Sequence, residues 1–250
     1  MSGRRVVYGL HAVTAALKQR PGSVFEVFLD AGRNDPRARR VVDLAKAAGV
    51  RLHETDAQRI EGFAKGGRHQ GVAAFVEEVE LAGSLNEVLD DLAEPAFLLI
   101  LDGVQDPHNL GACLRVADGA GAHAVVAPKD HAVGLNATVA KVASGAAETV
   151  PYFMVTNLAR TLNELKERDI RIVGTAEDAP GTIYDADLSG PVALVFGAEG
   201  SGMRQLTAKT CDELAHLPMQ GAVESLNVSV ASGVCLYEAA RQRRGGGTPR

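Results

Sequence analysis

The stretch from Pro191 to Ser229 decides the fold of this chain, and it contains the segments PVALVFGAEGSGM (191–203), CDELAHLPM (211–219) and SLNVS (225–229). The apolar, β-branched run Val192–Phe196 ends at a glycine, which predicts a buried strand followed by a tight turn. A second short run, Leu214–Met219, precedes Gly221 in the same way. Polar side chains then alternate where a helical apolar spacing begins, at Ser225, Asn227 and Ser229. Two strand ends, two glycine turns and a polar helix start therefore predict a functional site.

The composition is that of an ordinary globular protein with a sizeable core. The chain has 250 residues, of which 46% are hydrophobic and 23% charged, so it can hold one large domain or two small ones. The longest uninterrupted apolar run, Ala96–Leu101, is far shorter than the ~20 residues of a membrane helix, and no signal-peptide segment follows Met1. The three cysteines are widely spaced and predict neither disulfides nor a zinc site. We therefore expect a cytoplasmic protein without a membrane segment or a metal.

The net charge of −5 hides a marked difference between the two parts of the chain. Residues 1–76 carry 13 Lys and Arg against 7 Asp and Glu, a net +6, whereas residues 77–250 carry 13 against 24, a net −11. Uneven charge is common in proteins, so the split alone carries no firm meaning. It fits a chance difference and a basic recognition module attached to an acidic domain equally well.

The pattern of predicted elements changes at the same place. Up to residue 76, strands and helices alternate in the order β-α-β-α-β, which predicts a small α/β domain over residues 1–76. The acidic segment 77–95, with a short helix from Ser84 to Leu92, is predicted to be a linker. Residues 96–250 then form a second domain, in which we expect the glycine-rich tail 244–250 to be disordered.

Longer α/β units make up the second domain. Strands are predicted at 97–101, 125–126, 152–155, 170–174 and 192–196, and helices at 109–121, 137–146 and 158–168. This alternation favours a mostly parallel sheet with helices on both faces. Ligands of such sheets bind beyond the carboxyl ends of the strands, where the polar positions of interest fall: Asp102, Asn109, Thr175, Gly197 and Glu199.

Each candidate residue also has a simpler interpretation. Asn109 taken alone is best explained as a cap at the start of a helix. Arg115 lies six residues later in an otherwise apolar helix, so a functional role is at least as well supported as a solvated position. Glu199 in the glycine turn would repel phosphates and would tolerate a cation or a hydroxyl donor, although a surface acid on a turn is the commoner case. Capping explains one polar residue of SLNVS, not all three.

Taken together, these segments resemble the signature motifs of the SpoU/TrmH group of SPOUT methyltransferases. The motifs are N-x-G-x-x-x-R at 109–115, G-x-E-G at 197–200 and P-M-x-G…S-L-N-V-S at 218–229. The resemblance extends to YGLHAV (8–13), HQG (69–71) and LNATVAKVASGAAE (135–148), and it covers essentially residues 6–243 without a departure at any motif position.

The resemblance implies an α/β fold of two parts. The first 76 residues are similar to an L30e-like RNA-binding domain, in agreement with their positive charge. The remainder resembles the SPOUT fold, a mostly parallel sheet with helices on both faces and a deep trefoil knot, a feature that composition could not suggest because knots are nearly absent from proteins. The resemblance also implies a homodimer that packs through the knotted domain, and S-adenosylmethionine as cofactor. The positions that match its binding site are Gly197, Leu217 and Leu226, with Thr175 and Met219 as neighbours.

The implied reaction is transfer of a methyl group to the ribose 2′-hydroxyl of one guanosine in the peptidyl-transferase P loop of bacterial large-subunit rRNA. A tRNA or another rRNA position remains the alternative within this group. The implied catalytic residues are Arg115, Asn109, Glu199, Ser225 and Asn227. Because a guanidinium stays protonated, we assign Arg115 to stabilising the developing alkoxide and gripping the adjacent phosphate rather than to a general base. The candidate RNA contacts are Arg33, Arg37, Arg40, Lys65 and Arg68.

Two other classes of function remain open from the sequence. The first is a nucleotide- or NAD-binding enzyme that uses the FGAEGSG turn, which the missing G-x-G-x-x-G spacing and the acid at the turn disfavour. The second is a non-catalytic RNA-binding protein on the same fold, which the presence of all five candidate catalytic residues disfavours.

Overall fold

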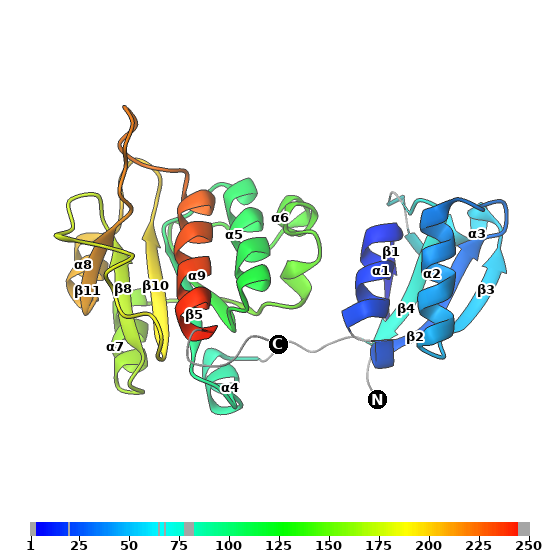
Figure 1. Cartoon of the computed structure of the whole chain (residues 1–250), viewed down its shortest axis with the longest axis horizontal. Helices are drawn as coiled ribbons and strands as arrows, with labels where there is room; N and C mark the ends of the chain where they lie inside the picture. The colour runs from blue at the N-terminus through cyan, green and yellow to red at the C-terminus, as the bar shows by residue number, and fades with distance from the viewer. Residues whose placement is uncertain (1–3, 20, 65, 68, 78–82, 245–250) are drawn as a thin grey trace. The chain divides into compact units, whose positions relative to one another are not determined.

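The chain divides into two compact units, Met1–Glu80 and Leu81–Arg250, which we call the small unit and the large unit (Figure 1). The computed structural model describes residues 4–19, 21–64, 66–67, 69–77 and 83–244. No helix in this described part of the chain combines the length and the apolar character that a membrane span requires.

A four-stranded sheet in the order β1-β4-β2-β3 forms the centre of the small unit. β4 runs antiparallel to both β1 and β2, whereas β2 and β3 are parallel. The elements in chain order are β1 (Arg4–Tyr8), α1 (Leu10–Gln19), the 3-10 turn η1 (Pro21–Ser23), β2 (Val24–Asp30), α2 (Pro36–Ala47), β3 (Arg51–Thr55), α3 (Ala57–Ala64) and β4 (Val72–Glu77). The observed order β-α-β-α-β-α-β has the predicted alternation and is longer than the predicted β-α-β-α-β order by one helix and one strand.

The two faces of this sheet are covered by different helices. In β4, Val72, Ala74 and Val76 pack with the apolar faces of α1 and α2, while Ala73 faces the cluster formed with α3. α2 begins where the sequence predicts, because the Asp35 side chain accepts hydrogen bonds from the backbone N–H groups of Arg37 and Ala38 and Pro36 occupies the first turn.

The large unit is built on a seven-stranded sheet in the order β7-β6-β5-β10-β8-β11-β9. All its strand pairings are parallel, which confirms the predicted sheet type. Its strands are β5 (Phe97–Asp102), β6 (Ala124–Pro128), β7 (Tyr152–Val155), β8 (Arg171–Thr175), β9 (Gly181–Thr182), β10 (Val192–Gly197) and β11 (Glu213–His216). Its helices are α4 (Leu85–Asp90), α5 (Pro107–Ala120), α6 (Ala137–Ala143), the 3-10 turn η2 (Ala146–Glu148), α7 (Leu158–Lys166), α8 (Gln205–Thr210) and α9 (Val228–Arg244).

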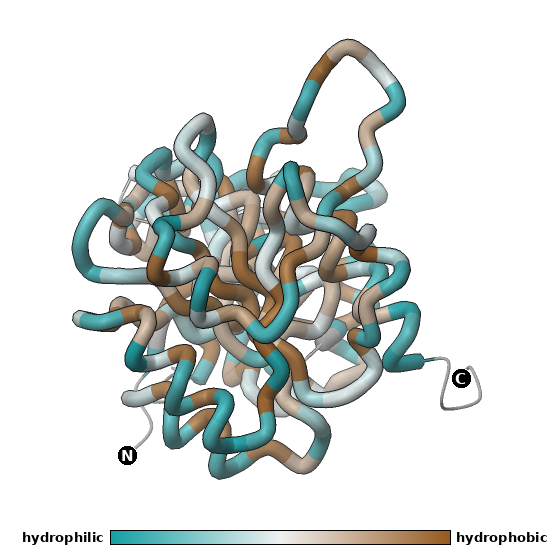
Figure 2. Tube along the Cα trace, turned by 90° about the vertical axis from the view of Figure 1, so that its left-hand side faces the viewer, coloured by the Kyte–Doolittle hydropathy of each residue, from teal (hydrophilic) through white to brown (hydrophobic). Residues whose placement is uncertain are grey.

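Helices cover both faces of this sheet (Figure 1). In β5, Phe97, Leu99 and Leu101 belong to the core beneath α5, α6 and α9, whereas Leu98 and Ile100 point into the core beneath α4 and α7. This alternation buries every residue of the strand, as a central parallel strand requires. Figure 2 shows the resulting gathering of apolar segments in the interior, with polar segments around them.

The end of α6 and the presence of α8 and β9 differ from the sequence-based expectation. The helix predicted over 137–146 ends at Ala143, because Ser144 and Gly145 adopt left-handed conformations with φ of 54° and 100°. The short elements α8 and β9 have no counterpart in the predicted pattern. The short helix predicted after Ser84 is present as α4, and its Leu85, Val88 and Leu89 pack against the core of the large unit.

Candidate functional site

The carboxyl ends of neighbouring strands bring the polar positions together. β10 lies between β5 and β8, and Gly197 at its end pairs with Asp102 at the end of β5. Thr175 ends β8, and its hydroxyl donates to the carbonyl oxygen of Val195 at 3.2 Å. This is the edge at which ligands of open parallel sheets bind.

The loop after β10 is tightly folded and depends on glycine. A Cβ at Gly197 would lie 2.0 Å from the carbonyl carbon of Gly202 and 2.1 Å from the backbone nitrogen of Met203, so no side chain fits there. Ala198 and Gly202 exchange backbone hydrogen bonds of 3.1 and 2.9 Å. Gly200 and Gly202 adopt positive φ angles of 76° and 65°, which favour glycine. The loop therefore presents Glu199 in a fixed position.

An ion pair between a buried carboxylate and a half-exposed arginine anchors the far end of this loop. Asp102 is 1% exposed, and its carboxylate accepts from the Arg204 backbone N–H at 2.9 Å and from the Arg204 Nε at 2.7 Å. A terminal guanidinium nitrogen of Arg204 lies 2.6 Å from the same carboxylate. Asp102 was among the polar strand-end positions of interest, but nothing in the sequence pointed to Arg204 as its partner, since 102 positions separate the two.

Three of the predicted catalytic residues meet through one amide. The Asn227 Nδ2 donates to Asn109 Oδ1 at 3.0 Å and also to Glu199 Oε1. The Asn227 Oδ1 accepts from the backbone N–H and from the hydroxyl of Ser229, at 2.9 and 2.6 Å, so this side chain also caps the start of α9. Every polar atom of the Asn227 side chain therefore has a partner, and we call Asn109, Glu199 and Asn227 the amide network.

The amide network leaves two polar groups available to a ligand. Within the described residues, the Asn109 amide nitrogen and the second carboxylate oxygen of Glu199 make no hydrogen bond. The first is a donor and the second an acceptor, which suits recognition of a hydroxyl group. Asn109 is 8% exposed and does not cap its helix, because Asp106 does so by accepting from the His108 N–H at 2.9 Å. The capping interpretation of Asn109 is therefore wrong.

The segment between β11 and α9, residues 217–227, projects beyond the strand ends (Figure 1). Leu217 packs against the core, Met219 is half-buried, and Leu226 is 37% exposed. Over residues 217–226 no backbone N–H or C=O makes a hydrogen bond with another described residue. The exposed Ser225 side chain likewise makes no hydrogen bond with the amide network. The segment thus offers apolar side chains and uncommitted backbone groups next to the glycine loop.

Arg115 lies apart from the amide network. It is exposed on α5, and in the described part of the chain its guanidinium has no hydrogen-bond or ion-pair partner. Six residues separate it from Asn109, which places it about 9 Å further along the helix and about 240° around it. Asn109 and Arg115 therefore point in different directions.

Burial raises the pKa of all three cysteine thiols. Cys113 lies between Asn109 and Arg115 on α5, and burial raises the pKa of its thiol to about 11, to which the nearby charge of Glu199 adds. Burial also raises the pKa of Cys211 to about 11 and that of Cys235 to about 12. Among the described residues, no group of three His, Cys, Asp or Glu side chains is arranged to hold a metal ion.

The predicted RNA contacts of the small unit fall into three groups. The Arg33 guanidinium is engaged by Asp35, 2.5 Å away, and by the carbonyl oxygen of Gln70. Arg37 and Arg40 lie on α2 and line a groove between α1 and α2. Lys65 and Arg68 lie outside the described residues.

Comparison with known proteins assigns both units. Residues 96–237 match the SpoU rRNA Methylase family, and residues 6–82 match the family described as RNA 2′-O ribose methyltransferase substrate binding. A relative from Ralstonia nicotianae, named 23S rRNA (guanosine-2′-O-)-methyltransferase RlmB, is 59% identical over 97% of this chain and 98% of its own. The relative of the same name from Bordetella pertussis is 57% identical over 98% of this chain and 100% of its own.

A solved structure agrees with this assignment. The SpoU methyltransferase AviRb from Streptomyces viridochromogenes, in complex with the cofactor AdoMet, superposes with a TM-score of 0.67 at 25% identity, over 98% of this chain and 92% of that one. The matched family model covers more than half of the chain, including every residue of the amide network. The chain therefore belongs to the SpoU rRNA methylase family.

Proposed function

We propose that this protein transfers a methyl group from S-adenosylmethionine to the ribose 2′-oxygen of a guanosine in bacterial 23S rRNA. The observation that carries the proposal is the amide network, which leaves one donor and one acceptor free at the carboxyl ends of the strands. Two relatives more than 55% identical over nearly their whole length bear the name of this activity, which supports the same substrate class here.

The residues present fit the cofactor. S-adenosylmethionine carries an adenine with apolar faces, hydroxyl groups, a carboxylate and an ammonium group. The apolar side chains of Leu217, Met219 and Leu226 can cover the adenine, and the uncommitted backbone groups of residues 217–226 can bind its polar edge. Gly197 and Thr175 lie at the adjoining strand ends. The AdoMet complex of AviRb, a protein with the same fold, supports this choice of cofactor.

The chain's own residues position the hydroxyl that is methylated. When bound, S-adenosylmethionine supplies an electrophilic methyl group on a sulfonium, which is already a good leaving group. Positioning the 2′-hydroxyl and helping to remove its proton are therefore the tasks left to the protein. The free amide nitrogen of Asn109 donates a hydrogen bond to the ribose 2′-oxygen. The free oxygen of Glu199 accepts a hydrogen bond from the 2′-hydroxyl group. Asn227 holds both side chains, and Ser225 contacts the ribose or cofactor from the projecting segment.

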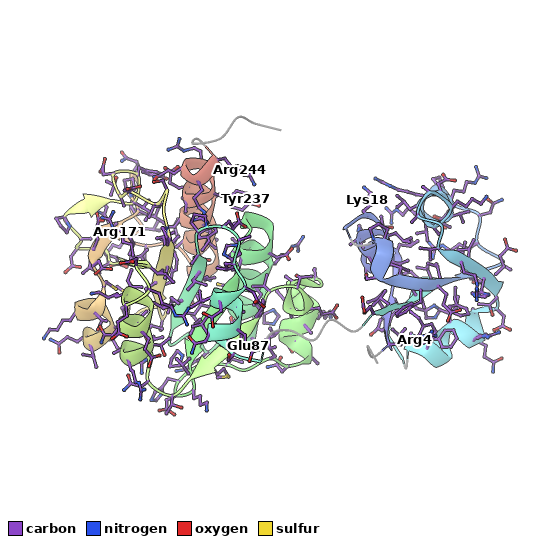
Figure 3. All side chains as sticks on the ribbon, turned by 90° about the horizontal axis from the view of Figure 1, so that it is seen from below. Arg4, Lys18, Glu87, Arg171, Tyr237 and Arg244 are labelled. Carbon is purple, nitrogen blue, oxygen red and sulfur yellow. The ribbon has the colours of Figure 1, made fainter. Side chains whose placement is uncertain are left out.

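Arg115 supplies the positive charge that a developing alkoxide requires. It lies near an exposed face of α5 and α9 that carries Val230 and Tyr237, which are 51% and 55% exposed, together with the half-buried Val116. Figure 3 labels Tyr237 on α9. We propose that a second copy of the chain covers this apolar face in a homodimer through the knotted large unit, and that Arg115 acts in the partner's site.

The finer features of the target are part of the same proposal. The guanosine is the one in the peptidyl-transferase P loop, and the protein acts in the cytoplasm as part of ribosome assembly. The basic small unit grips the rRNA, in keeping with its match to a substrate-binding family.

The direct test is transfer of labelled methyl from S-adenosylmethionine to 23S rRNA from cells that lack this modification, followed by mapping of the labelled ribose. Label on one P-loop guanosine is the expected result. Label at another ribose would retain the chemistry and refute the target. Absence of transfer to this rRNA, with binding of the cofactor demonstrated by a shift in melting temperature, would refute the proposed reaction on 23S rRNA.

A further inference from the structure

A groove lies between the two helices that cover one face of the small unit. It has a volume of about 370 Å³ and is lined from α1 by Leu10, His11, Thr14, Ala15 and Lys18, and from α2 by Arg37 and Arg40. The α1 residues recur at helical spacing, so they form one face of that helix. We call this surface the α1–α2 groove; its end at Lys18 is labelled in Figure 3.

The lining of the α1–α2 groove is positively charged and lacks an acid. Lys18, Arg37 and Arg40 are exposed, and in the described part of the chain none of their side chains takes part in a hydrogen bond or an ion pair. Asp35, the acid at the start of α2, is already bound to the Arg33 side chain and to the first N–H groups of the helix. The cations of the groove are therefore not neutralised from within the described part of the unit.

Other basic side chains of the small unit are committed to internal contacts. Arg4 pairs with Glu26 and lies over the Phe25 ring, and Arg59 lies over the Phe28 ring. Arg39, on the same helix as Arg37 and Arg40, donates to the side chain of Asn34 at 3.0 Å. The cations of the groove have no such partner among the described residues and, like the exposed Lys46 and Arg51 outside the groove, are available to a ligand outside the unit.

The dimensions of the groove suit consecutive phosphates. His11 and Lys18 are seven residues apart, which corresponds to about 10 Å along α1. In duplex DNA each strand carries one phosphate per ~3.4 Å of helix axis, and successive phosphates along the strand itself are further apart than this rise, so the groove can contact about two consecutive phosphates. No aromatic side chain lines the groove, so it offers no platform on which bases could stack.

We propose that the α1–α2 groove binds the phosphodiester backbone of the rRNA substrate, through Lys18, Arg37 and Arg40 as cations and His11 and Thr14 as hydrogen-bonding groups. This inference rests on the proposed function and adds to it the surface of the small unit that meets the RNA. It gives Arg37 and Arg40 a role that Arg33 does not share, because the Arg33 guanidinium is held by Asp35 and Gln70. Contacts of this kind position the RNA without reading its sequence.

The test compares two double variants of the full chain that lose the same charge. Lys18→Ala with Arg40→Ala removes two cations of the groove, whereas Lys46→Ala with Arg51→Ala removes two exposed cations of the same unit that do not line it. Binding to a fragment of 23S rRNA is measured between about 50 and 200 mM salt. We expect the groove variant to reduce the magnitude of the negative slope of log K against log salt by about 1.4 to 1.8. The control variant should keep a slope near the wild-type value.

Methyl transfer provides the second readout. The groove variant is expected to raise KM for rRNA about tenfold at unchanged kcat, because it weakens binding away from the reacting atoms. Restoring the charges as Lys18→Arg with Arg40→Lys should restore the slope. The proposal would be overturned if the groove variant kept the wild-type slope. It would also be overturned if the groove and control variants lost the same amount of slope, which would indicate an effect of net charge alone. If the wild-type chain binds the rRNA without methylating it, the proposed function fails, while the comparison of slopes still decides on the groove.

Discussion

Replacing Gly197 with alanine tests whether the geometry of the glycine loop controls the activity. The new Cβ would lie 2.0 Å from the carbonyl carbon of Gly202, where ordinary contacts begin at 3.4 Å, so the loop must retreat by 1.4 Å, the difference between the two. The obstacle is backbone rather than the end of a flexible side chain, so it cannot rotate away. A shift of this size stretches the two hydrogen bonds between Ala198 and Gly202 and displaces Glu199 from Asn227.

The expected cost can be estimated from these contacts. Two backbone hydrogen bonds contribute about 0.5–1.5 kcal/mol each, and overpacking costs about 1–3 kcal/mol, so we expect Gly197→Ala to destabilise the large unit by roughly 4 kcal/mol. Misplacing a catalytic group by about 1 Å can reduce the rate 100-fold, so kcat/KM for methyl transfer should fall about 100-fold.

The assay combines thermal unfolding with methyl transfer at a temperature at which the variant remains folded. Gly190→Ala is the matched control, because a Cβ at Gly190 meets no atom within 4 Å and its φ angle is not positive. The control should retain the stability and activity of the wild type. If Gly197→Ala transfers methyl at a rate within about threefold of the control, the loop geometry does not set the position of Glu199, and the reasoning is refuted.

Two further predictions concern the ion pair and the arginine of α5. Arg204→Ala leaves the buried Asp102 carboxylate unpaired and should cost about 3 kcal/mol, at the low end for buried pairs because the Arg204 side chain is 49% exposed. The double variant with Asp102→Asn should be more stable than Arg204→Ala alone in thermal unfolding; an equally unstable double variant would contradict this. Asn109→Ala and Arg115→Ala should each be inactive alone, yet an equimolar mixture after subunit exchange should recover about a quarter of the wild-type rate, since half the dimers then hold one complete site. No recovery in the mixture would indicate that Arg115 acts within its own subunit.

The sheet and most of its helices could be predicted because their signals are local. β10 and β5 are short, wholly apolar runs bounded by turn residues, and α2 begins at an Asp-Pro pair. α8 was missed because it has six residues and its first turn carries no cap hydrogen bond from the Arg204 side chain. The end of α6 was misplaced because Ser144, rather than a glycine, takes the first left-handed position.

The site was predictable in its residues and only partly in its contacts. The motif positions Asn109, Glu199 and Asn227 meet because three segments far apart in the chain converge, and no spacing within the sequence measures that distance. The pairing of Asp102 with Arg204 could not be foreseen for the same reason. The sequence also left open a nucleotide- or NAD-binding enzyme. The match to the SpoU family argues against that class, and the G-x-E-G turn is one of the motifs that already indicated this family.

The chemistry of the amide network bears on where the positive charge of the reaction comes from. Asn109 and Glu199 supply a donor and an acceptor, but among the described residues that hydrogen-bond to this network none is basic. Arg204 is not available, because Asp102 holds its guanidinium. A deprotonating hydroxyl beside the Glu199 carboxylate would develop negative charge next to an existing negative charge, which is unfavourable without a cation. Arg115 is the motif residue that can provide it. Since Arg115 points away from Asn109 on an exposed helix face, we infer that the site is completed by the arginine of a second copy.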